Sequence, residues 1–336
     1  MALPSDPMSG DNGARPIGVL GLGSIGLRHA RNLLDLGREV IGYDPDPARQ
    51  ATVAALGGEI APNRDALLKQ SAAVVVCSPN AHHRDDLGDA IAAGCSVLIE
   101  KPLAHTDIGL EELLDQAERQ GLVIFAGFNL RFHPAVRLAA QWLAEKRLGT
   151  PLWARAIFSD FLPHWRPSQD YRLGYTADPR TGGVIFDVIH EIDLVTALLG
   201  PGRMEAASAR NTGTLGITSE DCADLLIRHS CGVQSSVHLD YVTRPRRRVT
   251  EIAGTTGMLI LDLDARRLSH IGFDGGVVAE VAFPGSASDD YREEMRAFLA
   301  CLDDMESPAC DGRQALAVLR LALDARRLAK LPPTRK

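Results

Sequence analysis

Short apolar runs alternate with helix-like stretches through the first third of this 336-residue chain, and this alternation limits the fold more than any other feature. The runs end in turn or polar residues, as buried strands do. Strands that are apolar on both sides belong to parallel sheets covered by helices, and right-handed crossovers then favour a doubly wound sheet. The strand-like runs are PIGVLGL, EVIGYD, AAVVVCSP, CSVLIEKP and LVIFAGFN, and the helix-like stretches lie near residues 25–36, 45–56, 64–70, 82–93 and 107–120.

The pattern changes after Asn129. Strand-like runs follow one another from residue 203 to 283 without helices between them, which predicts a mostly antiparallel sheet. Residues 181–199 are predicted to form one helix, because Ile, Val and Leu recur there at steps of three and four. We therefore expect an α/β chain with domains at 16–129 and 130–336. Residues 1–15 are expected to be a flexible tail, and further elements are predicted at about 134–147 (helix), 151–161 (strand), 288–304 (helix) and 312–330 (helix).

Bulk properties exclude several classes of protein. No apolar run reaches the roughly 20 residues that a membrane-spanning helix needs. The net charge of −7 provides no electrostatic footprint for nucleic acid or an anionic membrane. The opening residues lack the basic and apolar regions of a secretory signal. Six scattered cysteines without a C-x-x-C pair predict reduced thiols, and neither they nor the ten histidines form a recognisable set of metal ligands. We expect a cytoplasmic protein without a metal centre.

A glycine-rich loop follows the first predicted strand and opens the first predicted helix. The first glycine permits a tight turn, the second lets the backbone approach a pyrophosphate, and the third allows the helix to pack closely on the strand. The helix N-terminus adds favourable electrostatics for phosphate. Residues 16–129 are therefore predicted to be a dinucleotide-binding Rossmann domain. The loop residues expected at the cofactor are Gly21, Gly23, Ser24, Ile25 and Gly26.

Asp44 ends the second predicted strand, in the run VIGYD. Its carboxylate can accept hydrogen bonds from a ribose 2′-hydroxyl and would repel a 2′-phosphate, so NAD is favoured over NADP. Arg49 is nearby and would weaken that preference if its loop turned inward. The alternative is that Asp44 is a solvated cap.

Polar residues follow the predicted strands of the N-terminal sheet at their carboxyl ends. Ligands of doubly wound sheets bind beyond those ends, so these residues are expected to form walls of the nicotinamide and substrate site. A histidine at such a position is also a common helix-start or packing residue, and both interpretations stay open for His83. The residues expected beside the cofactor are Ser78, Asn80, His83, Glu100, Lys101 and Asn129.

Three residues are expected to carry the chemistry. Lys101 ends an apolar strand, where an ammonium can stabilise negative charge that develops on a reacting hydroxyl; otherwise it is a solvated strand end. Asp187 and His190 interrupt an apolar segment three residues apart, and on a helix they share one face. An imidazole there can take a carbinol proton while hydride leaves the same carbon. Asp187 could orient that ring or contact the substrate, and the alternative is a core histidine satisfied by a carboxylate.

Three segments carry a family resemblance: G-L-G-S-I-G, E-K-P-L-A and G-G-V-I-F-D-V-I-H-E-I-D. In this order, over nearly the whole chain, the sequence resembles the glucose–fructose oxidoreductase / inositol dehydrogenase (Gfo/Idh/MocA) family. The resemblance implies that the Rossmann domain is followed by an α/β domain with a large, mostly antiparallel open sheet. It also implies NAD(P)-dependent chemistry on a CH–OH group of sugars or inositols, and homodimers or homotetramers joined through that sheet.

On the family pattern Lys101 is the E-K-P lysine, His190 the catalytic histidine and Asp187 the accompanying aspartate. Many members separate this aspartate and histidine by four residues, whereas here the separation is three. Both spacings keep the pair on one helical face. The role of Asp187 is therefore less firmly implied than that of His190.

Two segments point to the substrate. The stretch 161–180 is rich in aromatic and basic residues, as binding loops often are, although it could also be an ordinary surface loop. The basic group 244–248 could meet a phosphate or carboxylate, or form a solvated turn or a subunit contact. Part of the first stretch, W-R-P-x-Q-D-Y-R, resembles family members associated with surface-polysaccharide sugars. The expected substrate ligands are Lys101, Trp165, Arg166, Tyr171, Asp187 and His190, with His164 and Arg172 as further candidates.

Together these features predict an NAD(P)-dependent dehydrogenase acting on a sugar, cyclitol or nucleotide sugar, with His190 exchanging the proton and Lys101 stabilising the alkoxide. One alternative is an aldose–aldose oxidoreductase with tightly bound cofactor, which retention of NAD through dialysis would favour. The other is a non-catalytic dinucleotide-dependent sensor, because a fold does not fix a function.

Overall fold

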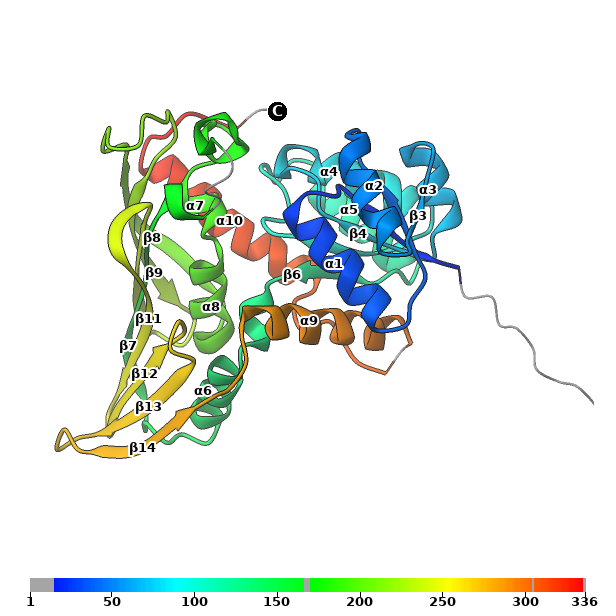
Figure 1. The fold of residues 1–336 in the computed structure, drawn as a ribbon. Coiled ribbons are helices and arrows are strands. Elements are labelled where there is room, and N and C mark those ends of the chain that lie inside the picture. The colour runs from blue at the N-terminus through cyan, green and yellow to red at the C-terminus, as the bar shows by residue number, and fades with distance from the viewer. Residues whose placement is uncertain (1–14, 166–169, 304, 335–336) are drawn as a thin grey trace, which may run out of the picture.

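The computed structural model describes residues 15–165, 170–303 and 305–334. Two sheets lie at opposite ends of it, with helices between and around them (Figure 1). Apart from Arg15, the predicted N-terminal tail lies outside the described residues, and so does the candidate substrate ligand Arg166. Within the described ranges, no helix is both long enough and apolar enough to cross a bilayer.

The N-terminal sheet has the strand order β3-β2-β1-β4-β5-β6 and is parallel throughout, which confirms the predicted doubly wound sheet. The order reverses between β1 and β4, the point at which such sheets bind ligands. The edge strand β3 has two residues, too few to stand out as an apolar run. The strands are β1 (Ile17–Leu20), β2 (Val40–Tyr43), β3 (Glu59–Ile60), β4 (Ala73–Val76), β5 (Ser96–Glu100) and β6 (Ile124–Gly127); the helices are α1 (Ser24–Asp35), α2 (Pro47–Ala55), α3 (Arg64–Gln70), α4 (Asn80–Ala92) and α5 (Leu110–Arg119).

The second sheet has eight strands in the order β14-β13-β12-β11-β7-β10-β9-β8, and only β7 and β10 pair in parallel. This confirms the predicted mostly antiparallel sheet. Helices α6 (Pro134–Ala144), α8 (His190–Leu199) and α10 (Gly312–Leu328) lie on one face of the sheet, and no helix of the described residues covers the other face (Figure 1). The strands are β7 (Pro151–Phe161), β8 (Gly202–Arg210), β9 (Cys222–His229), β10 (Gln234–Asp240), β11 (Val242–Gly254), β12 (Gly257–Asp262), β13 (Arg267–Gly272) and β14 (Val277–Ala282).

The single helix predicted at 181–199 is wrong: the segment forms α7 (Val184–Asp187) and α8, which starts at His190. In a continuous helix the amide of Glu191 would bond to the carbonyl of Asp187. Here that amide bonds to the carbonyl of Val188, and the Asp187 carbonyl accepts a hydrogen bond from the Lys101 ammonium. Asp187 and His190 therefore lie on either side of a break in the helix, which residue spacing alone does not reveal.

Helix α9 (Ala287–Leu302) belongs to the last part of the chain but packs on the first sheet. Its Met295 and Phe298 are fully buried in one apolar cluster with residues of β1 and α1. The Phe298 ring meets Phe125 of β6 edge-on at 5.8 Å between centroids. Helix α10 contacts both β6 and β8 and so joins the two sheets (Figure 1). The C-terminal helices thus fix the position of the second sheet relative to the first.

Candidate active site

The glycine-rich loop connects β1 to α1, and its three glycines meet different demands. A Cβ on Gly21, whose φ is +84°, would lie 2.7 Å from backbone atoms of Cys77, and a Cβ on Gly26 would lie 1.8 Å from the Gly21 oxygen. A Cβ on Gly23 would meet only the Arg49 side chain, at 3.9 Å. Packing within the protein therefore requires Gly21 and Gly26, whereas Gly23 leaves open space at the start of the helix.

The first turn of α1 suits a phosphate. No side chain caps the helix, and the turn contains no acidic residue that would repel an anion. The amides of Ser24 and Ile25 lie in this uncapped turn. Together with the open space at Gly23, these residues fit the pyrophosphate of a dinucleotide.

Asp44 lies at the end of β2 with 2% of its surface exposed. Its carboxylate accepts hydrogen bonds from the amide of Leu22 at 2.7 Å and the amide of Asp46 at 2.9 Å. The half-exposed Arg49 side chain lies 3.3 Å from the same carboxylate. Arg49 is therefore at the ribose position together with Asp44. A carboxylate has about four acceptor sites, so these bonds leave room for a ribose hydroxyl.

The loop after β4 is tied to its neighbours by buried polar side chains. The His83 ring lies 2.8 Å from the carbonyl oxygens of both Ser78 and Pro102, and only 1% of its surface is exposed. His83 therefore connects two strand ends as a structural bridge. The Asn80 amide donates to the carbonyl of Thr181 at 2.6 Å, which links this loop to the segment before α7.

Lys101 lies between the end of β5 and helix α7. It follows β5, and its ammonium donates to the carbonyl oxygen of Asp187 at 2.7 Å. The preceding Glu100 is buried and bonds to His29 at 2.8 Å. Asn129, at the end of the neighbouring strand β6, is also buried. Because the Lys101 contact runs from the end of β5 to the last residue of α7, it places the ammonium beside the break between α7 and α8.

The carboxylate of Asp187 is held by two hydroxyl groups. Thr176 donates to Oδ2 at 2.6 Å, and Tyr241 donates to the same oxygen at 2.8 Å. Both Asp187 and Tyr241 are buried. Among the described residues, no hydrogen bond joins Asp187 to the His190 imidazole. The hydroxyl pair therefore orients Asp187, and Asp187 fixes the main chain that receives Lys101.

His190 begins α8 in a buried, electropositive position. Burial, the Lys101 ammonium and the Arg248 guanidinium lower the pKa of His190 well below its ordinary value. Its Nδ1 has no hydrogen-bond partner among the described residues, and Phe128 meets the ring edge-on at 5.8 Å. The imidazole is therefore neutral at physiological pH, and a neutral imidazole can accept a proton.

Trp165 is the aromatic residue of the 161–180 segment that reaches the Asp187 network. Its ring meets Tyr241 at 5.3 Å and Phe158 at 5.8 Å, both edge-on, and its buried Nε1 has no partner among the described residues. The hydroxyl group of Tyr171 instead donates a hydrogen bond to the carbonyl of Leu215, at 3.0 Å. Of these two candidates, only Trp165 contacts Tyr241, one of the two residues that hold Asp187.

The remaining candidates of this segment lie further out. Arg172 is exposed and pairs with Asp170 at 2.8 Å. His164 is exposed and contacts the Phe161 ring, with 4.9 Å between centroids. Arg244 covers the same ring at 3.8 Å. The Phe161 ring, at the end of β7, therefore contacts the exposed side chains of both His164 and Arg244.

Two arginines of the basic group 244–248 pair with carboxylates. Arg246 pairs with Asp160 at 3.1 Å and Asp264 at 3.0 Å. Arg248 forms two hydrogen bonds with the buried Glu191, at 2.7 and 3.1 Å. Arg248 thus has a local structural partner and at the same time lowers the pKa of His190.

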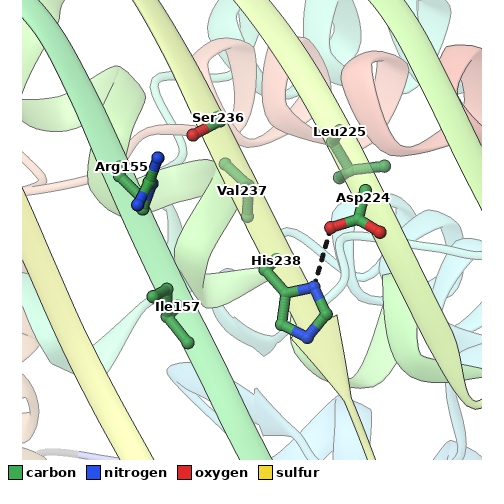
Figure 2. A pocket seen from close by; sticks show the side chains of 7 residues that line it. All are labelled: Arg155, Ile157, Asp224, Leu225, Ser236, Val237 and His238. Carbon is green, nitrogen blue, oxygen red and sulfur yellow. Dashed lines mark hydrogen bonds and ion pairs between the residues drawn. The ribbon is translucent and has the colours of Figure 1, made fainter.

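A separate hollow of about 340 Å³ lies on the opposite face of the large sheet. Figure 2 shows Arg155, Ser236, Asp224 and His238 in front of the strands, with the helices behind. His238 bonds to Asp224 at 2.7 Å and to Asp240 at 3.1 Å. This hollow contains neither Lys101 nor His190 and is distinct from the candidate active site.

Sequence reasoning did not single out Tyr241, Thr176, Glu220 or Arg326. Tyr241 directly follows β10, and an aromatic residue with a hydroxyl group at the end of a strand was the available signal. Glu220 and Arg326 form a buried ion pair at 3.1 Å, and a Cβ on Gly183 would lie 2.2 Å from the Glu220 carboxyl group. Their separation of over a hundred residues gives no pattern along the chain, because the pair forms only when α10 packs against α7.

Comparison with known proteins places this site in a family. Residues 15–128 match the model described as the oxidoreductase family with an NAD-binding Rossmann fold, and residues 136–260 match the GFO/IDH/MocA C-terminal domain. The chain belongs to the Gfo/Idh/MocA family of oxidoreductases. The predicted family, fold class and NAD-binding Rossmann domain are therefore confirmed.

Three relatives show the range within the family. D-apiose dehydrogenase from Paraburkholderia graminis is 28% identical, over 90% of this chain and 84% of that protein. Inositol 2-dehydrogenase from Acidothermus cellulolyticus is 30% identical, over 78% and 77%. UDP-N-acetylglucosamine 3-dehydrogenase from Acidithiobacillus ferrooxidans is 27% identical, over 92% and 95%. A solved structure of this third relative superposes with a TM-score of 0.78 at 23% identity, covering 94% of this chain and 98% of that one.

Proposed function

We propose that this chain catalyses hydride exchange between NAD and a carbinol or carbonyl carbon of a sugar, cyclitol or nucleotide sugar. The observation that carries the proposal is the position of Lys101, whose ammonium reaches the Asp187 carbonyl beside the buried, neutral His190. The three relatives act, by their names, on a pentose, a cyclitol and a nucleotide sugar.

The chain's own residues then divide the work. NAD, when bound, supplies the hydride acceptor, and the Gly23 loop and Asp44 would hold its pyrophosphate and ribose. The neutral imidazole of His190 takes the hydroxyl proton. Lys101 donates a hydrogen bond to the reacting oxygen and stabilises its developing negative charge. Trp165 offers its free Nε1 to a substrate hydroxyl, and Thr176 and Tyr241 keep Asp187 in place.

The test is a panel of inositols, aldoses and nucleotide sugars with NAD and with NADP, read by the absorbance of the reduced nicotinamide. At least one carbinol substrate should turn over, and NAD should exceed NADP because Asp44 would repel a 2′-phosphate. Lys101→Ala and His190→Ala should each lower kcat by about a hundredfold or more. Lys69→Ala, an exposed lysine on α3, is the matched control. Unchanged rates in both site variants would contradict the proposed chemistry.

We further propose that residues 16–129 hold the cofactor and residues 130–336 hold the substrate and form a homodimer or homotetramer. Trp153 is 41% exposed and lies two residues before Arg155 in β7, so it is on the same face of the large sheet as the hollow. Light scattering should give a dimer or tetramer that Trp153→Glu dissociates. Phe273→Glu, at the exposed turn between β13 and β14, should leave assembly unchanged. A monomeric native chain would reject this part.

The six free cysteines support the cytoplasm as the proposed location.

A further inference from the structure

A cluster of three buried, ionisable side chains includes Glu100, the residue directly before Lys101. His29 of α1, Glu100 of β5 and Glu294 of α9 bring their ligand atoms within 4.8 Å of one another. His29 and Glu294 are fully buried and Glu100 is 6% exposed. Two of these elements border the proposed cofactor site, because α1 follows the glycine loop and β5 ends at Glu100, directly before Lys101.

The hydrogen bonds of the cluster are incomplete. His29 Nε2 lies 2.8 Å from a Glu100 oxygen, and the Lys101 amide donates to the other Glu100 oxygen at 3.3 Å. Both carboxyl oxygens of Glu294 and the Nδ1 of His29 have no partner within the described part of the chain. An unpartnered carboxylate in such surroundings is strongly unfavourable, so Glu294 needs a proton or a cation.

The charges around the cluster favour a proton. Burial opposes the ionisation of Glu100, yet the bond to His29 and the charges of His29 and Lys101 hold the pKa of Glu100 below its ordinary value. Burial and the Glu100 charge together raise the pKa of Glu294 well above its ordinary value. Two adjacent carboxyl groups of this kind share a proton, as acid and carboxylate.

The ionisable neighbours supply no cation to Glu294. Burial and then the charge of Glu100 raise the pKa of Tyr291 and of Cys77, so both side chains are neutral. Burial also raises the pKa of Cys310, which lies within electrostatic reach of Glu294. Arg28 is directed to the Tyr291 ring, 4.6 Å from its centroid.

The geometry also disfavours a metal ion. A nitrogen and an oxygen that bind the same zinc ion tetrahedrally lie about 3.4 Å apart, given metal–ligand distances of about 2.1 Å. The 2.8 Å between His29 and Glu100 is the length of a direct hydrogen bond. The pair is therefore arranged for a proton between its own atoms.

We propose that Glu294 is a positioning residue that keeps its proton and donates it, directly or through one water molecule, toward the Glu100–His29 pair. Through Glu100 this shared proton sets the electrostatic environment of Lys101, and it ties α9 and α1 to the end of β5. The role for Lys101 rests on the proposed function. The protonation state of Glu294 does not.

Infrared spectroscopy of the full chain tests the proton. A protonated carboxylic acid has a carbonyl stretch that an ionised carboxylate lacks, and Glu220, with a pKa of about 7, is largely ionised at about pH 8.5. At that pH, we expect the band in the native chain and its loss in Glu294→Gln. Glu293→Gln, exposed on the same helix, is the matched control and should keep the band. No band in the native chain, or a bound cation that Glu294→Gln releases, would overturn the proposal.

The positioning role is measured without turnover, so its failure is separable from failure of the proposed reaction. The rate at which Lys101 reacts with an amine-selective reagent is followed across pH by peptide mass spectrometry, with Lys69 as internal reference. Glu294→Gln keeps a donor and should leave the Lys101 midpoint unchanged. Glu294→Met removes the donor, so Glu100 keeps more of its negative charge and should raise the midpoint by about half a pH unit, a factor of about three in reactivity.

Equal Lys101 midpoints in the native chain and in Glu294→Met would reject the positioning role. Equal shifts in Glu294→Gln and Glu294→Met would also reject it, because the donated proton would then not matter. If Glu294→Met does not fold, the infrared comparison with Glu294→Gln still decides whether Glu294 carries the proton.

Discussion

The Lys101 ammonium donates to the main-chain oxygen of Asp187 at 2.7 Å. This bond joins the end of β5 in the parallel sheet to the break between α7 and α8 that lies against the larger sheet. The contact uses the carbonyl that a continuous helix would have paired with Glu191. One hydrogen bond therefore accompanies the helix break and holds the lysine. The positions of Asp187 and His190, on either side of the break, depend on this bond.

Tyr241→Phe should lower kcat with little loss of stability. The change removes one of two donors to the Asp187 carboxylate but leaves Thr176, so we expect a destabilisation of about 1 kcal/mol and a fall in kcat of about tenfold. Steady-state kinetics and thermal denaturation measure the two effects. Tyr43→Phe, at the end of β2, is the control. An unchanged kcat would mean that Asp187 needs no such support.

The acid limb of the pH–rate profile for oxidation should lie below about pH 6.5, the ordinary value for histidine. The lowered pKa keeps His190 neutral and able to accept a proton, so activity is lost only as pH falls through that lowered value. Arg248→Gln removes one cause of the shift and should move the limb upward by about half a unit or more. Arg247→Gln, an exposed neighbour, should not move it. The same limb in all three proteins would argue against His190 as the base.

Substitution of two loop glycines separates packing from ligand binding. Gly23→Ala meets no protein atom closer than 3.9 Å, so we expect unchanged thermal stability and NAD affinity weakened by about tenfold or more. Gly26→Ala would place its Cβ 1.8 Å from the Gly21 oxygen and should destabilise the chain by about 2 kcal/mol or more. Calorimetric titration with NAD and thermal denaturation distinguish the two. Native NAD affinity in Gly23→Ala would remove the proposed phosphate site.

Stability should decline between about pH 6.5 and pH 9 because of His238. Its hydrogen bond to Asp240 and, despite partial burial, that to Asp224 raise its pKa to about 9. A raised pKa means that this group's contribution is complete below its unfolded value of about 6.5 and is lost as pH rises through 9. His238→Asn should flatten this part of the stability profile, measured by chemical denaturation at several pH values. An equally steep decline in the variant would show that other groups cause it.

The sequence could predict the elements whose signals lie close together along the chain. Gly21, Gly23 and Gly26 stand between a buried strand and a helix, and this local context indicates a Rossmann domain. The predicted strand at 151–161 has the observed bounds of β7, because a long alternating run has only one extended register. Lys101 stood out for the same reason, as a charged residue directly after an apolar strand.

By itself, the sequence determined the alternation of strands and helices in the first third of the chain, the glycine loop and the candidacy of Lys101 and His190, since each depends on neighbours within a few residues. Tertiary structure decided the helix break at Asp187, the hydroxyl groups of Thr176 and Tyr241 that hold it, and the meeting of Glu294 with His29 and Glu100. These contacts join residues that are distant in the chain. Their energy comes from removing paired polar groups from water, so no periodic pattern announces them, and they form only when the helices and both sheets pack.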